Sequence, residues 1–410
     1  METQRVDARP DRNFWCLIGD AGLFSLAAVC FEPTVVLSVF VAQLTSWPIL
    51  IGAPAALRIA GLYLPQLPVA LGIRNFGHIQ SFFFWQALVG RTALIGCAIA
   101  AFFANSVPPE LTLGLLFVAW SIFTFTEGAA TLAWLDLIGD IVDPRLRGRY
   151  FGIVQVLGGV MAFIAGLGVS AALAGSLAPR SFASLFAWGF VGFMFSVVCI
   201  GLVRERRDTR RPPLVESSVA HVLKLVRGKH LFRLILAQIL AGSLQIALPF
   251  YALFGREQLG LGGEWIGSFI VAQTLGGSIA ALAWAPLAGR YGARLVISLS
   301  AALLAVIPWL PMLAERSAGV ALLATFLLAG AARGGSQAGF WQYVLDLVPA
   351  RDRRVFMGLA NTANAPTLLM PVLGGVLLEW GGYPWMFGTS IALGIAATLS
   401  GLWLAPTSRD

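Results

Sequence analysis

Long apolar stretches, separated by short polar or charged segments, follow one another along almost the whole chain. A helix that crosses a bilayer needs about 20 mostly apolar residues. On this basis the sequence predicts an all-α membrane protein with twelve spans, near residues 14–42, 49–73, 81–104, 111–139, 150–173, 181–203, 231–255, 265–288, 295–314, 318–347, 355–379 and 385–404.

The composition fits a membrane protein and disfavours several other classes. Hydrophobic residues make up 58% of the chain and charged residues 12%, which is unlike a soluble domain. The net charge of +8 comes mainly from arginines in loops, so we expect no nucleic-acid partner. The four cysteines lie in apolar stretches without CxxC spacing, and no G-x-x-x-x-G-K-S/T loop occurs. We therefore expect no metal, no cofactor and no direct use of ATP.

The second half of the chain repeats the first. Residues 140–152 reappear as 346–358, after a shift of 206 residues, with acidic and basic positions in register. Tandem halves with several spans each are typical of transporters built from parallel repeats. We expect a six-helix bundle from residues 1–203, a basic cytoplasmic linker from 204–230, and a second six-helix bundle from 231–410.

Arginine and lysine are distributed unequally between alternate loops. With both termini inside, 22 of the 28 basic residues fall on the cytoplasmic side and 3 on the outer side, leaving 3 within the spans. Basic residues favour the cytoplasmic side of membranes. The sequence therefore predicts a multi-pass protein of the bacterial inner membrane with cytoplasmic N- and C-termini.

Three short motifs resemble the major facilitator superfamily. The segment 289–294, Gly-Arg-Tyr-Gly-Ala-Arg, resembles that family's loop motif G-x-x-x-D-R-x-G-R-R/K, with Gly289 in place of its Asp. The matching loop of the first half keeps Arg74 and Gly77, and residues 371–375 resemble the family's Pro-x-x-Gly-Gly segments. The resemblance covers nearly the whole chain. It implies two pseudo-symmetric bundles that rock around a central cavity lined by the first, fourth, seventh and tenth spans.

Two opposite charges occupy the same position of the repeat. Glu127 lies near the middle of the fourth span and Arg333, 206 residues later, near the middle of the tenth. Charges at this depth are costly and mark functional sites. We expect the two to face one another across the cavity and bind solute or proton, with Gln337 one turn from Arg333. The alternative is that Glu127 pairs with Arg91 inside its own bundle.

Three further charges lie within the first two spans. Glu32 and Arg58 fall at similar depth in the outer half of the membrane, which favours an intramembrane ion pair. Pro33 and Pro249 occupy corresponding places, so the first and seventh spans are both expected to kink there. Asp20 has no obvious partner. It is either a proton carrier or a wetted cavity charge.

The repeated acidic and basic loop residues predict a cytoplasmic gate that ties helix ends together. Its candidate residues are Asp140, Arg145, Arg147, Asp346, Arg351, Arg353, Arg290 and Arg294. A solvated interfacial charge cluster is the alternative. Gln238, Gln245 and Asn361 extend the candidate solute site, although polar residues in membrane helices also serve as interhelical glue.

The sequence as a whole predicts a monomeric secondary transporter in the lipid bilayer, not an enzyme. It would move a small-molecule substrate by alternating access, with a proton as the expected coupling ion. An exporter of amphipathic compounds and an uncoupled facilitator are alternatives. A transporter-like sensor or assembly factor is the rival from another class.

Overall fold

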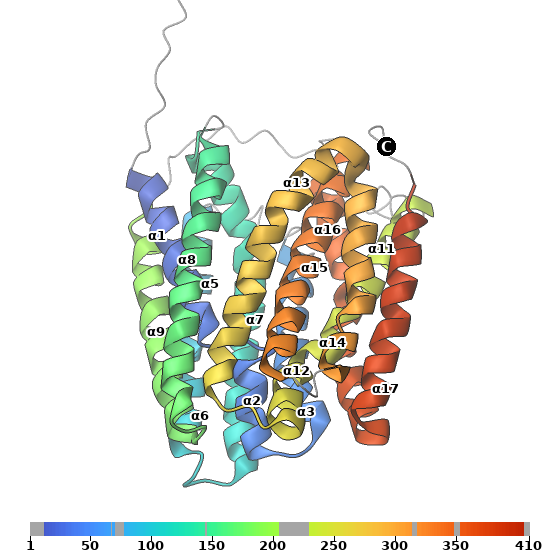
Figure 1. Ribbon diagram of the computed structural model, residues 1–410. Coiled ribbons are helices and arrows are strands. Elements are labelled where there is room, and N and C mark those ends of the chain that lie inside the picture. The colour runs from blue at the N-terminus through green and yellow to red at the C-terminus, as the bar shows by residue number, and fades with distance from the viewer. Residues whose placement is uncertain are drawn as a thin grey trace, which may run out of the picture.

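The computed structural model describes residues 12–66, 68–69, 78–143, 146–204, 229–313, 318–347 and 353–405. Throughout this part of the chain the regular structure is helical, and the helices run side by side in one bundle (Figure 1). The start of α1 and the end of α17 lie at the same end of the bundle, here called the terminal end, and the opposite end is the far end. The prediction of an all-α membrane fold is confirmed.

The helices of the first half, up to residue 204, are α1 (Arg12–Val29), α2 (Val36–Leu44), α3 (Pro48–Tyr63), α5 (Ile79–Ala93), α6 (Ile95–Phe103), α7 (Pro109–Ile141), α8 (Arg147–Ala174) and α9 (Pro179–Gly201). Those of the second half, from residue 229, are α11 (Lys229–Ala241), α12 (Leu244–Leu259), α13 (Glu264–Val306), α14 (Trp309–Met312), α15 (Ala318–Leu347), α16 (Arg353–Ala363), the 3-10 helix η3 (Ala365–Leu368) and α17 (Leu369–Leu402).

Eight helical stretches among the described residues are long and apolar enough to cross a membrane. Two of them reverse direction, α13 at Gly292 with φ 81° and α17 at Gly382 with φ 69°. Glycine is required at both reversals because positive φ is strained for other residues. An unbroken 43-residue helix would be about 65 Å long, roughly twice the hydrocarbon core. α13 therefore contains two spans. The segment from α16 through η3 to the end of α17 contains two more, and α1–α2 and α3 supply the remaining two of the twelve predicted.

The first and seventh spans are both interrupted. The first breaks at residues 30–35, as expected from Pro33. The seventh breaks at Gly242 and Ser243, seven residues before Pro249, and this proline lies inside α12. A kink at Pro249 itself stays a prediction. A Cβ on Gly242 would lie 2.6 Å from Cγ2 of Thr367 in η3. The close approach of η3 to the chain fixes the position of this break.

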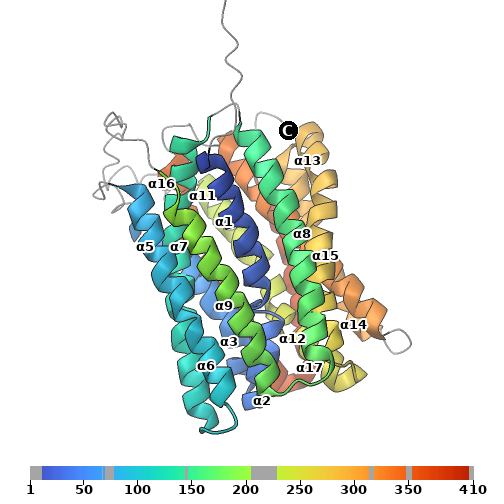
Figure 2. The ribbon, with the colours of Figure 1, turned by 90° about the vertical axis from the view of Figure 1, so that its left-hand side faces the viewer.

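The halves meet chiefly where α8 lies beside α13 (Figure 2) and where α3 packs on α17 and η3, with smaller contacts of α12 with α2 and α3. A Cβ on Gly267 of α13 would lie 2.0 Å from the carbonyl oxygen of Gly166 on α8. A Cβ on Gly52 of α3 would lie 2.7 Å from the carbonyl oxygen of Pro371 on α17. Small residues allow backbones to approach closely in membranes, where the hydrophobic effect adds little to helix association. The predicted linker, 204–230, lies almost wholly outside the described residues.

Candidate functional site

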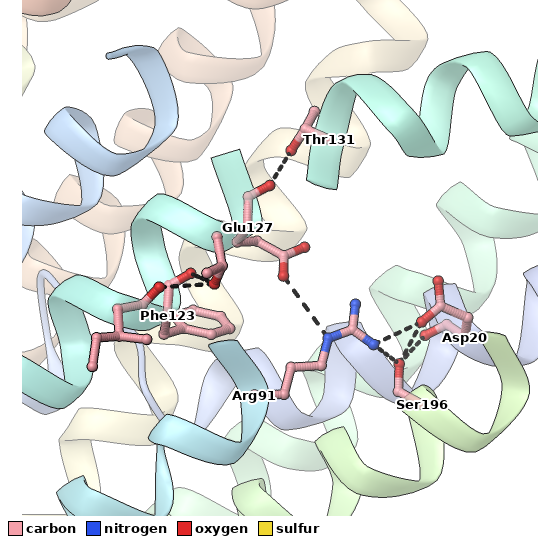
Figure 3. Close-up of polar contacts among 8 residues, drawn as sticks. Asp20, Arg91, Phe123, Glu127, Thr131 and Ser196 are labelled. Atoms are coloured by element: carbon pink, nitrogen blue, oxygen red, sulfur yellow. Dashed lines mark hydrogen bonds and ion pairs between the residues drawn. The ribbon is translucent and has the colours of Figure 1, made fainter. Parts of the chain in front are cut away.

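A buried arginine joins three helices of the first half. Arg91 on α5 is 1% exposed, and its Nη1 donates to Oδ1 of Asp20 on α1 at 3.0 Å and to Oγ of Ser196 on α9 at 2.7 Å (Figure 3). The Ser196 hydroxyl donates in turn to Oδ1 of Asp20 at 2.5 Å. The guanidinium also lies 5.1 Å from the ring centre of Phe24 and 5.8 Å from that of Phe193. Asp20, expected to have no partner, therefore has two.

Glu127 on α7 extends this cluster. Its Oε2 lies 3.8 Å from Nε of Arg91, and its side chain is 12% exposed. It therefore sits at the edge of the buried cluster, more accessible than Asp20. The alternative expectation, that Glu127 pairs with Arg91, describes this geometry.

Close packing of α3 on α7 brings Arg58 toward Glu127. A Cβ on Gly128 would lie 2.0 Å from the carbonyl oxygen of Gly61. The guanidinium of Arg58 lies 6.0 Å from the ring centre of Phe123, and its Nη1 is buried without a hydrogen-bond partner. The charged side chains near Arg58 are Glu127, Arg333 and Glu32.

Glu32 lies in the break between α1 and α2 and is held by the backbone. Its carboxylate accepts hydrogen bonds from the backbone N–H groups of Thr34 at 2.8 Å and Val35 at 2.6 Å, and from the Thr34 hydroxyl at 2.9 Å. The break leaves these N–H groups free, and a carboxylate near the start of α2 is favourable. The predicted Glu32–Arg58 ion pair is wrong, because these groups lie more than 4.0 Å apart and interact only at longer range.

Arg333 on α15 belongs to the second half but interacts with charges of the first. It is exposed and lies within electrostatic range of Glu32 and Arg58. Its side chain therefore lies near charged groups of the first half. No ion pair within 4.0 Å joins Glu127 to Arg333, both of which the structure describes. Arg58 interacts with each of them at longer range.

The other predicted solute-site residues are dispersed. Gln337 is exposed, and Gln245 is half-buried on α12. Gln238 on α11 has a buried Oε1 without a hydrogen-bond partner. Asn361 Nδ2 donates to Oε1 of Gln66 at 2.8 Å, so it joins the two halves directly.

The predicted gate residues that the structure describes lie at the terminal end. Arg147 donates to the carbonyl oxygens of Gly139 and Val142 at 2.6 and 3.2 Å and so caps α7. Arg294 donates to the carbonyl oxygen of Leu402. Arg290 is exposed and Asp346 half-buried. Arg145 and Arg351 lie outside the described residues, and so do the side chains of Asp140 and Arg353.

The far end carries a cavity and three hydrogen bonds between the halves. The cavity measures about 400 Å³ and is lined by ten residues that include Gln43, Thr45, Ser46 and Glu257. The hydrogen bonds run from Trp47 Nε1 to Glu379 Oε2 at 3.2 Å, from Arg256 Nη2 to Gln43 Oε1 at 3.5 Å, and from Ser170 Oγ to the Glu264 carbonyl oxygen at 2.6 Å. The described residues hold no group of three or more His, Cys, Asp or Glu side chains that could bind a metal.

Comparison with known proteins decides the family. The model of the Major Facilitator Superfamily matches residues 35–366 and 266–410. The chain belongs to this superfamily. No curated protein sequence matches it.

Solved structures of other superfamily transporters share the fold. The D-xylose-proton symporter is similar with a TM-score of 0.75 at 14% identity, covering 97% of this chain and 98% of that one. A variant of the nucleoside transporter NupG has a TM-score of 0.75 at 15% identity, covering 96% and 100%. The inward-open xylose transporter XylE from E. coli has a TM-score of 0.71 at 13% identity, covering 97% and 96%.

The sequence alone does not point to two of the site residues in this superfamily member. Ser196, which bridges Asp20 and Arg91, is a single hydroxyl in an apolar span, and only its isolation there marks it. Gln66 near the end of α3 pairs with Asn361, 295 residues away. Their partners depend on which helices are neighbours, which a single sequence does not specify.

Proposed function

We propose that this superfamily member is a secondary transporter that moves a small solute across the bacterial inner membrane by alternating access, coupled to a proton. The two halves, joined by the basic segment 204–230, would rock around the space that Arg58 and Arg333 face. Glu127 is the proposed proton carrier, with Asp20 as the other candidate. The termini would face the cytoplasm.

The observation that carries this proposal is the position of Glu127. Its carboxylate lies between two arginines, 3.8 Å from Arg91 and within electrostatic range of Arg58. Arg91 is already occupied by Asp20 and Ser196. Protonation of Glu127 would therefore remove a negative charge that acts on Arg58 at longer range. Binding of a single proton would thus change the net charge of the residues around a solute that is bound between the halves.

Asp20 is the weaker candidate because its charge is more tightly held. It accepts two short hydrogen bonds in a nearly solvent-free site. A proton would reach it only after the Arg91 contact opened. Its proposed role is to hold Arg91 in place beside Glu127.

The predicted gate is proposed to close the terminal end. Asp140 and Asp346 occupy equivalent repeat positions beside the loop arginines. Asp140→Asn with Asp346→Asn should then favour an open terminal end. If the distances between spin labels on the two halves do not change, these residues do not form a gate and are a solvated charge cluster.

Reconstitution tests the transport proposal. Purified full-length protein is placed in liposomes containing a pH-sensitive dye, and a panel of anionic, neutral and cationic solutes is added outside. Secondary transport with proton coupling predicts dye signals with at least one solute, absent from empty liposomes. Solute uptake without a dye signal would indicate an uncoupled facilitator. Absence of any flux would favour a sensor or assembly factor.

A further inference from the structure

Arg58 on α3 and Arg333 on α15 belong to opposite halves of the molecule and are close enough to interact electrostatically. As like charges, they repel one another. Neither forms an ion pair within 4.0 Å with a residue that the structure describes. We propose that a small organic oxyanion, a carboxylate or a phosphate, is the solute and binds between these two arginines. This inference rests on the proposed transport function and names its substrate class.

Arg58 supplies the first half of the anion site. Its Nη1 is buried and has no hydrogen-bond partner. Buried donors are nearly always paired in folded proteins, so an unpaired guanidinium group indicates a missing acceptor. The ring of Phe123 lies near the guanidinium but accepts no conventional hydrogen bond. An oxyanion between the halves would supply that acceptor.

Arg333 supplies the second half. It is exposed and makes no hydrogen bond to a described residue, so its planar group of donors is available. Guanidinium groups match carboxylate and phosphate oxygens with two parallel hydrogen bonds. An anion held by one arginine from each half would draw the halves together. Its binding would thus be linked to the conformational change.

The neighbouring acids do not occupy this position. Glu32 accepts hydrogen bonds from Thr34 and Val35, and Glu127 is directed toward Arg91. The charged groups around the site are therefore Asp20, Glu32 and Glu127 against Arg58, Arg91 and Arg333, with Tyr63 near Arg58. These six charges balance. A monovalent anion entering together with one proton, taken up by Glu127, preserves the balance.

The charge count predicts an observable property of transport. Uptake of a monovalent anion with one proton moves no net charge. A membrane potential alone should then drive no accumulation, whereas a pH gradient alone should. A monovalent cation entering with one proton would carry two positive charges, so a membrane potential alone would drive its accumulation.

Ligand binding to purified full-length protein tests the anion site directly. The probes are acetate, benzoate, succinate and phenyl phosphate, each beside its neutral twin, acetamide, benzamide, succinamide and phenol. At least one anion should raise the unfolding temperature while its twin does not. Arg58→Gln and Arg333→Gln should each weaken that anion's binding by about tenfold or more, the effect of losing one charged hydrogen bond.

The matched control is Arg149→Gln, which removes an exposed arginine at the start of α8 and should leave anion binding unchanged. Because Arg333 is exposed, its variant should fold even if the Arg58 variant does not. If a carboxylate binds and phenyl phosphate does not, the solute is a carboxylate. If phenyl phosphate binds and no carboxylate does, the solute is a phosphate. No anion binding above the neutral twins, or anion binding that survives Arg333→Gln, overturns the inference.

Failure of the inference can be separated from failure of transport. If a neutral or cationic solute moves protons in the dye assay while no anion binds, transport stands and the anion site is wrong. If an anion binds through Arg58 and Arg333 but no solute crosses the membrane, the anion site stands and transport is wrong.

Discussion

Arg91 and Asp20 form an ion pair of 3.0 Å in which the side chains are 1% and 4% exposed. The pair fixes α5 against α1, and Ser196 ties both to α9. It holds the guanidinium whose Nε faces Glu127. Arg91 and Asp20, the most buried charged residues in the described part of the chain, thus fix the position of the guanidinium that faces the more accessible Glu127.

Removing one partner of this pair should destabilise the protein strongly. Asp20→Asn leaves Arg91 without its carboxylate in a nearly dry site, and breaking such a pair costs roughly 3–5 kcal/mol. Ser196→Ala, the matched control, removes one hydrogen bond and should cost only about 1 kcal/mol. Equilibrium unfolding in detergent measures both. Equal stability of Asp20→Asn and the native protein would show that the pair contributes little.

Packing of α3 on α7 should control the distance between Arg58 and Glu127. Gly128→Ala places a methyl group where the Gly61 carbonyl oxygen lies, so the helices must separate. Gly114→Ala on the same helix meets nothing within 4 Å and should be neutral or stabilising by up to about 1 kcal/mol. Thermal unfolding and proton-coupled flux should fall only in the first variant. Native behaviour of Gly128→Ala would contradict this packing.

The sequence predicts the helices of this chain better than it predicts their contacts. The tenth predicted span, 318–347, coincides with α15, because apolar length alone marks a span. The broken first span followed from Pro33, but the break of the seventh at Gly242 depends on the approach of Thr367 from a distant segment. Which charges pair depends on the order and rotation of helices. For that reason the sequence predicts a pair of Arg58 with Glu32, which the structure does not contain, and gives no sign of the contact between Arg91 and Asp20.

The predicted orientation can be tested with cysteine labels at opposite ends. Ser106 lies in the exposed turn between α6 and α7, and Gly148 lies at the terminal end with space for a side chain. An impermeant thiol reagent on intact cells should label Ser106→Cys and not Gly148→Cys, and the native protein with its four cysteines gives the background. The reverse pattern would place the termini outside.

The far-end hydrogen bonds should favour the state in which that end is closed. Trp47→Phe, Glu379→Gln and Ser170→Ala together remove the donors or acceptors of two cross-half links. Spin labels at Ser106 and Leu313 should then report a longer average distance. Thr398→Ala, which removes a hydrogen bond within one helix, is the control. An unchanged distance in the triple variant would mean that backbone packing alone closes this end.

Glu127→Gln tests the proposed proton coupling most directly, once the dye assay has identified a transported solute. The substitution keeps the shape of the side chain and removes the proton site, and because Glu127 is 12% exposed and 3.8 Å from Arg91, the fold should persist. The variant should exchange labelled solute across the liposome membrane at rates near those of the native protein. It should fail to accumulate solute under a pH gradient. Uphill accumulation at the native level in Glu127→Gln would contradict the account and leave Asp20 as the remaining candidate for the proton carrier.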